Sequence, residues 1–477
     1  QFYAAVEFSP ANSFWNDFPI LNSYVTRVQS FLQDARPAND ILLYFPVFDR
    51  FADFNGRNLE HFDDISPAFK GSHFRKAAEL MNSRGFGFDY ISDLLLNGVV
   101  ADESLLFTGG NSYRTIVLPH CSYIPVATFN KLVNLAEKGA VIVIYGSFPD
   151  DVSGLKDLED NREIYSYLKE QIKFGRSNSE GIREAVVGTG RILTGEDLEQ
   201  LLLAAGARRE TMTDNGLAFN RRKVYDGSCY FIVNQSDKTF DGLLTLGAQA
   251  KAAAIFNPMT GISGTSKVRH PDGKTGIRIR LEPSESVIIK TSDKKIYGDL
   301  YSIYDPHGRP EELKGSWKIR FTTGGPVLPP ATETTSLKSW TLFGSKEYED
   351  FSGTAEYTII FPRPQAKAKA YMLDLGKVCE SARVYLNGTE IAGMIGPRFS
   401  TVIDRFMLKG ENELTIKVSN LSANRIAFLD RNKVNWKKFY NVNFPPRLPQ
   451  NRKDGLFDAS HWLPAESGLI GPVTLTP

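Results

Sequence analysis

Two hydrophobic patterns divide the chain near residue 210. Before that point, short continuous apolar runs alternate with segments whose apolar residues recur every three or four positions. Residues 41–47 form one such run, and residues 16–32 have the helical spacing. Strands that are apolar throughout and alternate with helices are typical of a parallel sheet covered by helices. Beyond residue 210, short strand-like runs are separated by turn residues, which predicts β-domains.

The middle of the chain predicts a Rossmann-like α/β domain over residues 71–210. Three strands and one helix are expected, at residues 88–91, 113–118 and 140–145 and at residues 125–138. Gly139 stands just after the helix, where a residue with positive φ commonly ends a helix. A further helix is expected from Asp197 to Ala205, ended by Gly206.

Two β-domains follow, a small β-sandwich over residues 211–293 and a larger domain over residues 294–477. The strands of the first are expected at residues 229–233, 243–246, 252–256, 277–281 and 286–290. In the second, residues 383–386 alternate between polar and apolar, and Asn387-Gly388 supplies the pair with positive φ that a two-residue hairpin needs. Together with the alternating residues 413–418, this pattern resembles the galactose-binding-like jelly roll appended to many glycoside hydrolases.

Composition narrows the choice of partners. Lys and Arg number 56 and Asp and Glu 55, so the net charge is +1, which argues against a nucleic-acid or polybasic membrane surface. No apolar run approaches the roughly 18 residues of a membrane span. The three cysteines are widely separated and form no CxxC or Cys/His cluster, so neither a zinc site nor a disulfide framework is expected.

The first 70 residues have the pattern expected for the last βα units of a (β/α)8 barrel. The loops that follow barrel strands form the active-site face. Here those loops would carry Glu7, Asn12 and Trp15, and then Asp49 and Asp53. Two strands cannot close a barrel of about eight. We therefore expect the earlier strands in an N-terminal barrel portion of the same protein, upstream of Gln1.

One cysteine offers a different chemistry. Cys121 follows a predicted strand and precedes a predicted helix, where amidotransferase-like hydrolases place a nucleophile, and His120 adjoins it. A nucleophile elbow requires flanking glycines, whereas the neighbours here are His120 and Ser122. We therefore interpret Cys121 as an inert loop residue.

Seven segments, taken in order, resemble glycoside hydrolase family 106. They are residues 22–33, 40–46, 340–343, 352–355, 423–426, 436–444 and 467–473. The resemblance runs along nearly the whole chain and corresponds to the C-terminal half of a family member. It implies an α-L-rhamnosidase that acts on pectin-like glycans by inverting hydrolysis, with a calcium ion in the complete barrel. It also implies a secreted or periplasmic protein.

Inverting hydrolysis requires two carboxyl groups, one as acid and one as base, roughly 6.5–9.5 Å apart. The resemblance places both catalytic glutamates on barrel strands upstream of Gln1. Glu7 is the carboxylate near a strand end that invites a catalytic assignment, although a rim residue is the simpler interpretation. Asn12, Trp15, Asp49 and Asp53 are the candidates for substrate binding, and no metal ligand is assigned.

Three hypotheses remain open at this point. The chain can be part of an enzyme that hydrolyses rhamnosyl linkages when joined to its barrel, a non-catalytic carbohydrate-binding module, or a scaffold whose jelly roll packs on the barrel. An exposed aromatic platform with a bound cation would favour the second hypothesis, and a flat polar surface buried against other domains the third.

Overall fold

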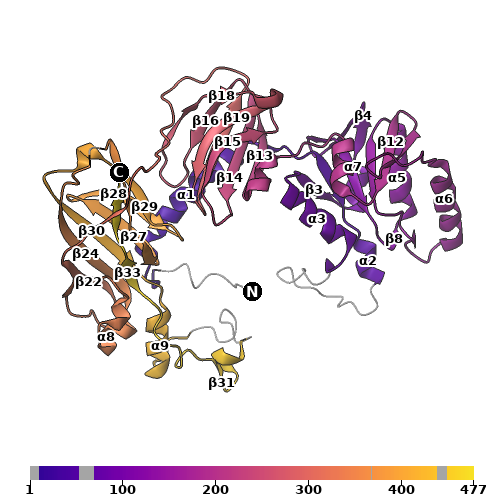
Figure 1. Cartoon of the computed structure of the whole chain (residues 1–477). Coiled ribbons are helices and arrows are strands. Elements are labelled where there is room, and N and C mark those ends of the chain that lie inside the picture. Colours follow the sequence, from indigo (N-terminus) through magenta and orange to yellow (C-terminus); the bar gives the residue numbers. More distant parts are fainter. Residues whose placement is uncertain (1–9, 53–68, 367, 438–447) are drawn as a thin grey trace. The chain divides into compact units, whose positions relative to one another are not determined.

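The structure is a computed structural model that describes residues 10–52, 69–366, 368–437 and 448–477. The chain folds into two compact units (Figure 1). One is the continuous segment Val28–Tyr301, and the other joins Ser302–Pro477 to the start of the chain up to Arg27. Each unit is described by itself below.

A six-stranded sheet forms the α/β part of the unit Val28–Tyr301. Its strands lie in the order β11-β12-β9-β7-β2-β3. Their bounds are β2 (Ile41–Tyr44), β3 (Phe88–Ile91), β7 (Thr115–Pro119), β9 (Val141–Tyr145), β11 (Arg183–Val187) and β12 (Gly190–Gly195). All neighbours pair in parallel except β11 and β12. The chain runs from β2 to β3 at one side and returns to β7 at the other, so the sheet is doubly wound.

Helices cover both faces of this sheet because its strands are apolar throughout. Alternate residues point to opposite faces, so Leu42 and Tyr44 pack with helices α4, α5 and α6, whereas Ile41 and Leu43 pack with α3 and α7. The helices are α2 (Val47–Ala52), α3 (His73–Arg84), α4 (Asp93–Asn97), α5 (Val126–Glu137), α6 (Leu158–Gln171) and α7 (Leu198–Ala204). The predicted elements at residues 88–91, 113–118, 125–138 and 140–145 are confirmed.

The assignment of residues 41–47 to a barrel is wrong. The strand exists as β2, but it pairs with β3 and β7 in the doubly wound sheet. Its four residues are all buried, and an apolar strand fits either kind of parallel sheet. The sequence pattern could not distinguish the two, because the choice depends on strands more than 40 residues away. The other expected barrel strand, at residues 2–8, lies outside the described residues.

The remainder of this unit is a small two-sheet β-domain, as expected. Its larger sheet has the order β1-β13-β14-β20-β16-β17 and its smaller sheet the order β15-β19-β18, and one apolar core lies between them. The bounds are β1 (Arg36–Pro37), β13 (Leu217–Val224), β14 (Gly227–Asn234), β15 (Phe240–Leu246), β16 (Ala252–Phe256), β17 (Ser263–Ser266), β18 (Val268–Arg269), β19 (Thr275–Leu281) and β20 (Ser286–Ser292).

A buried ion cluster connects the small β-domain to the chain leading into β2. The Arg221 guanidinium lies 2.6 Å from a carboxylate oxygen of Glu210 and 3.3 Å from one of Asp40. All three residues are at most 3% exposed. Arg208 adds a 2.7 Å ion pair to Asp40, and the Tyr230 hydroxyl donates to Glu210.

The charges in this cluster depend on one another. Burial would raise the pKa of Asp40, but the hydrogen bond and charge of Arg208 and the charge of Arg221 outweigh it, so the pKa lies below its usual value. Burial would lower the pKa of Arg221, and the charge of Glu210 outweighs that effect. A buried pair is costly to break because the remaining charge is left without compensation.

The second unit is a β-sandwich built from two main sheets around one core. The sheets have the orders β23-β22-β24-β30-β27-β28 and β21-β34-β25-β29. The bounds are β21 (Glu311–Glu312), β22 (Trp317–Gly325), β23 (Thr332–Thr334), β24 (Ser352–Pro362), β25 (Ala370–Asp374), β27 (Ser381–Leu386), β28 (Thr389–Ile395), β29 (Ser400–Asp404), β30 (Glu411–Ser419) and β34 (Thr474–Thr476). Helices α8 (Lys346–Asp350) and α9 (Ala423–Arg431) lie in the connections.

The hairpin predicted in this unit is confirmed. Asn387 and Gly388 have φ of 52° and 84°, and they join β27 to β28. The Asn387 side chain also accepts a hydrogen bond from the Glu413 amide and donates one to the carbonyl of Met407. This asparagine is therefore occupied by the turn, as the sequence suggested.

The start of the chain is fixed to this sandwich by Asp17. Its carboxylate accepts hydrogen bonds from the Ser381 hydroxyl (2.6 Å) and from Nε of Arg383 (2.7 Å). Arg383 also donates to the carbonyl of Asn16. Asp17 is 4% exposed. Helix α1 (Phe18–Leu32) begins directly after it.

Replacing Arg221 with methionine tests the buried ion cluster. R221M leaves Glu210 without its cation and Asp40 with a weaker set of partners, so we expect a loss of about 3–5 kcal/mol in the stability of the unit Val28–Tyr301. Faster hydrogen–deuterium exchange of peptides from this unit would report the loss. R162M is the matched control, because Arg162 forms its ion pairs at the surface and should change the exchange little.

Tryptophan fluorescence adds an internal reference to this experiment. All five tryptophans belong to the other unit, at positions 15, 317, 340, 436 and 462. Their unfolding transition should stay in place in R221M. Equal exchange rates in R221M and R162M would contradict the assigned role of the cluster.

Candidate functional site

A pocket of about 260 Å³ lies where the start of the chain meets the β-sandwich. Its walls come from the segment that precedes α1, from the ends of β22 and β24, and from the start of α9. The lining residues are Pro10, Ala11, Asn12, Ser13, Trp15, Asn16, Thr323, Gly324, Ser352, Gly353, Ser422 and Arg425. Two predicted substrate-binding residues, Asn12 and Trp15, are therefore brought together.

The segment that carries Asn12 and Trp15 is held by partly buried polar contacts. The Ser13 hydroxyl donates to the carbonyl of Asn420, and the Ser13 amide donates to the Ser422 hydroxyl. Asn420 is itself fixed, since its side chain accepts from the Gly353 amide (2.8 Å) and donates to the carbonyl of Phe351 (3.1 Å). The position of the pocket wall thus depends on the core of the sandwich.

Two glycines allow the floor of the pocket to form. A Cβ atom on Gly353 would lie 2.0 Å from the Thr323 carbonyl oxygen, and one on Gly324 would lie 2.4 Å from the carbonyl oxygen of Ser352. Any side chain at these positions would force β22 and β24 apart. Glycine therefore permits the close backbone approach at this end of the two strands.

The pocket offers an aromatic ring, a cation and several neutral polar groups. Trp15 is 38% exposed and stacks on Phe18, with ring centroids 5.7 Å apart. Arg425 is exposed, and within the described ranges its guanidinium forms neither an ion pair nor a hydrogen bond. No carboxylate is among the described lining residues. This set of groups suits a polar ligand with an apolar face and a negative charge.

The carboxylate of Asp49 makes contacts within its own unit. Its two carboxylate oxygens accept hydrogen bonds from the backbone amides of Ser122 (3.0 Å) and Tyr123 (2.9 Å). It thereby fixes the loop after β7, within the unit Val28–Tyr301. Each oxygen thus has a partner within the fold, and the substrate-binding role of Asp49 stays a prediction. Glu7 and Asp53 lie outside the described residues.

The structure agrees with an inert Cys121. Its side chain is 2% exposed, and burial together with the charge of Asp49 raises the pKa of the thiol well above its usual value. His120 contacts another group instead, since its Nδ1 lies 2.8 Å from the Ser147 hydroxyl. A buried thiol with a raised pKa supplies no thiolate for attack at neutral pH.

Within the described ranges, no group of three or more His, Cys, Asp or Glu side chains could hold a metal ion. No helix in the same ranges is both long and apolar enough to cross a bilayer.

The family follows from comparison with known proteins. The model of the glycoside hydrolase 106 family, described as alpha-L-rhamnosidase, matches residues 7–270. The chain belongs to this family. The resemblance seen in the sequence is thus confirmed.

Two relatives show how much of a family protein the chain represents. The solved structure of the rhamnosidase from Novosphingobium sp. PP1Y has 22% identity and a TM-score of 0.71, and the match covers 98% of this chain and 42% of that one. A putative beta-glucuronidase from Formosa agariphila is 32% identical over 121 residues, which are 25% of this chain and 10% of that protein. The chain thus has a rhamnosidase-like fold and spans less than half the length of either relative.

Sequence reasoning found one side of the pocket and missed the other. Asn12 and Trp15 were selected because they follow a predicted strand. Arg425 and Ser422 were not selected, although residues 423–426 contributed to the family resemblance. From the sequence alone, Arg425 is expected to be a solvated charge at the start of a helix. Only the fold shows that Arg425 and Trp15 line the same pocket.

The cysteines provide a test of the inert assignment. Cys121, Cys229 and Cys379 are all at most 5% exposed, and burial raises each thiol pKa, that of Cys229 to about 11. We expect iodoacetamide at neutral pH to leave all three unmodified in the native protein and to modify all three in denaturant, as read by mass spectrometry. Rapid native modification of Cys121 alone would reopen the acyl-transfer hypothesis.

Proposed function

We propose that this chain is the C-terminal portion of an α-L-rhamnosidase whose catalytic barrel lies mainly upstream of Gln1. The membership of the family carries the proposal. The reaction requires a pair of carboxyl groups, and the described lining of the 260 Å³ pocket contains none. The two catalytic glutamates are therefore assigned to the barrel portion, with Glu7 as a rim residue and any calcium ion in the same barrel.

Helix α1 supports the existence of a further portion. Apolar residues recur on it at the spacing of one helix face, as at Leu21 and Val25, yet within the described part of the chain none of its 15 residues is buried. Covering an apolar face stabilises a helix by roughly 25 cal/mol for each Å² removed from water. The barrel portion of the same protein is the proposed cover for this face.

The pocket at Trp15 and Arg425 suggests which glycan is bound. An indole ring packs well against the apolar face of a sugar ring. The Arg425 guanidinium, without a carboxylate partner in the described part of the chain, matches the carboxylate of a uronic acid. Rhamnose next to a uronic acid is the arrangement in pectin-like glycans. We assign Asn12, Trp15 and Arg425 to the binding of such a glycan beside the barrel, and the protein to the periplasm or the outside of the cell.

A non-catalytic role is the second candidate. A pocket with aromatic, cationic and amide groups but no carboxylate in its described lining would equally suit a carbohydrate-binding module. This alternative predicts glycan binding by a chain that never contributes to hydrolysis, even in the longer protein.

Activity measurements separate these candidates. We expect residues 1–477 alone to release no rhamnose from an aryl rhamnoside, whereas the protein extended upstream through its barrel should release it. Anomeric analysis of the first product should show inversion. Turnover by residues 1–477 would refute the assignment of the catalytic pair to the upstream portion, and an inactive longer protein would favour the non-catalytic role.

Replacing Arg425 with methionine tests the acidic glycan. In the longer protein, R425M should raise KM for oligosaccharides of alternating rhamnose and galacturonate about tenfold or more, because a hydrogen bond to a charged group contributes about 1.5–3 kcal/mol. KM for a neutral aryl rhamnoside should not change. R363M is the matched control, since Arg363 is an exposed arginine of the same sandwich outside the pocket. Equal losses on both substrates would contradict the role of Arg425 in recognising the uronate.

A further inference from the structure

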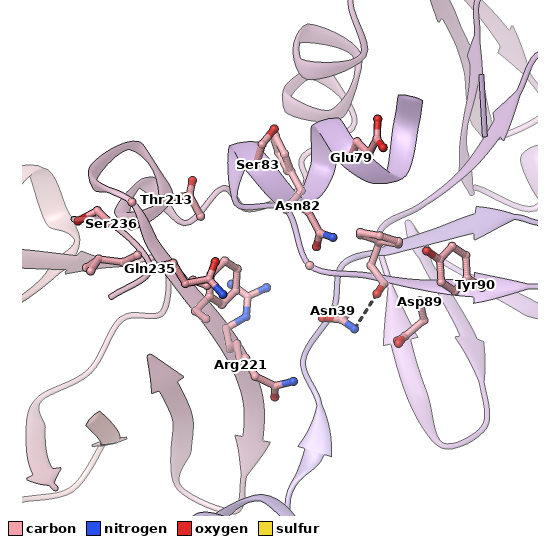
Figure 2. Close-up of a pocket in the computed structure, with 18 residues that line it drawn as sticks. Asn39, Glu79, Asn82, Ser83, Asp89, Tyr90, Thr213, Arg221, Gln235 and Ser236 are labelled. Carbon is pink, nitrogen blue, oxygen red and sulfur yellow. Dashed lines mark hydrogen bonds between the residues drawn. The ribbon is translucent and has the colours of Figure 1, made fainter. Parts of the chain in front are cut away.

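A second, larger groove opens within the unit Val28–Tyr301 (Figure 2). It lies between α3 and β3 on one side and β13 with the turn after β14 on the other, and its volume is about 990 Å³. This is at the upper end of the range of about 300–1,000 Å³ for small-ligand sites. The space is therefore large enough for an extended ligand.

Neutral amide groups dominate the polar lining. The side chains of Asn82, Asn220 and Gln235 are exposed, and none of them makes a hydrogen bond to another part of the described chain. Asn39 donates its amide hydrogen to the carbonyl of Phe88 at 3.1 Å. Figure 2 shows Asn39 and Asn82 pointing toward the same space, with Arg221 beside them. Each amide has two donors and an acceptor, which matches the hydroxyl groups of a sugar.

The charged residues of the groove are already paired. Arg221 is the only cation among the described lining residues, and it is held by Glu210, Asp40 and the carbonyl of Ala38. A phosphate or another polyanion would find no unpaired cation among these described lining residues. Of the two carboxylates, Glu79 pairs with Arg75, and Asp89 accepts from the Tyr113 hydroxyl. The groove therefore favours a neutral ligand.

An aromatic surface lies beside the amides. Tyr90 is 56% exposed, and its ring meets that of Phe88 at 85° with centroids 5.4 Å apart. The buried ring of Phe74 also contacts the ring of Tyr90, and their centroids are 5.5 Å apart. A ring that is packed against other aromatic residues, exposed to solvent and close to hydrogen-bonding groups is suited to contact the apolar face of a pyranose.

The walls of the groove are held before any ligand arrives. The Glu210 amide donates to the carbonyl of Gly85 at 2.8 Å, directly after α3. A Cβ atom on Gly85 would lie 2.1 Å from the carbonyl oxygen of Glu210, so the two backbones touch. Together with the ion pairs of Arg221, this contact fixes both sides. A site whose walls are already ordered loses less conformational entropy when a ligand binds.

We infer that this groove binds a neutral oligosaccharide of two or more sugar units. The amides of Asn82, Asn220 and Gln235 would contact hydroxyl groups, and Tyr90 would contact a sugar face. The inference goes beyond the proposed hydrolase, because it assigns a glycan-binding surface that contributes nothing to bond cleavage. This surface differs from the pocket at Arg425 because its described lining offers no unpaired cation.

Binding to a glycan array tests the groove. The probes are immobilised neutral plant glycans (xylan, glucomannan and arabinogalactan) and one acidic glycan, polygalacturonate, with the full chain as analyte. We expect retention on a neutral glycan, and tighter binding of longer than of shorter soluble fragments. The double variant N82A/Y90A should lower that affinity about tenfold or more. Both side chains are exposed, and alanine favours the helix at position 82.

A matched double variant completes the experiment. N130A/Y167A removes an exposed asparagine from α5 and an exposed tyrosine from α6, both outside the groove. It should bind like the parent chain. The inference is overturned if no immobilised neutral glycan retains the protein, or if polygalacturonate alone retains it. It is also overturned if N82A/Y90A binds as well as N130A/Y167A. A lost signal in both double variants would also overturn it, since the loss would then not depend on the groove. Because this assay measures no hydrolysis, its failure leaves the proposed rhamnosidase activity intact.

Discussion

The buried guanidinium of Arg221 is the interaction on which most of the unit Val28–Tyr301 depends. It is shared between Glu210, which precedes the small β-domain, and Asp40, which precedes the first strand of the α/β sheet. Neither carboxylate could be buried alone, because an unpaired charge in the interior costs far more than it contributes. The cluster thus fixes how the chain enters both sheets. It also explains why the described lining of the groove beside it presents amides and rings but no unpaired cation.

The sequence predicted best where the cause of a structure is local. Asn387 and Gly388 adopt the positive φ that their order suggested, and Gly139 ends α5 with a φ of 105°. Asp197 caps α7 by accepting a hydrogen bond from the Gln200 amide. Each of these results depends on a few consecutive residues, and their chemistry is visible in the sequence.

Prediction failed where a residue's role is decided by distant parts of the chain. The apolar run 41–47 looked the same whether it joined a barrel or a doubly wound sheet, and only its pairing with β3 and β7 decides between them. Nothing in the sequence around Asp17 indicates that its partner is Arg383, 366 residues away. Trp15 was selected as a candidate and Arg425 was not, for the same reason.

The contacts of Asp17 have a consequence for how the protein is made. The β-sandwich unit takes its material from both ends of the chain, and the unit Val28–Tyr301 is inserted between them. Domains generally fold as they leave the ribosome, in order of synthesis. The inserted unit can therefore reach its native state before Arg383, the partner of Asp17, has been translated. Of these two units, the one that starts to emerge first is thus completed last, so a ribosome that stalls before β27 would release a finished inner unit beside an unfinished outer one.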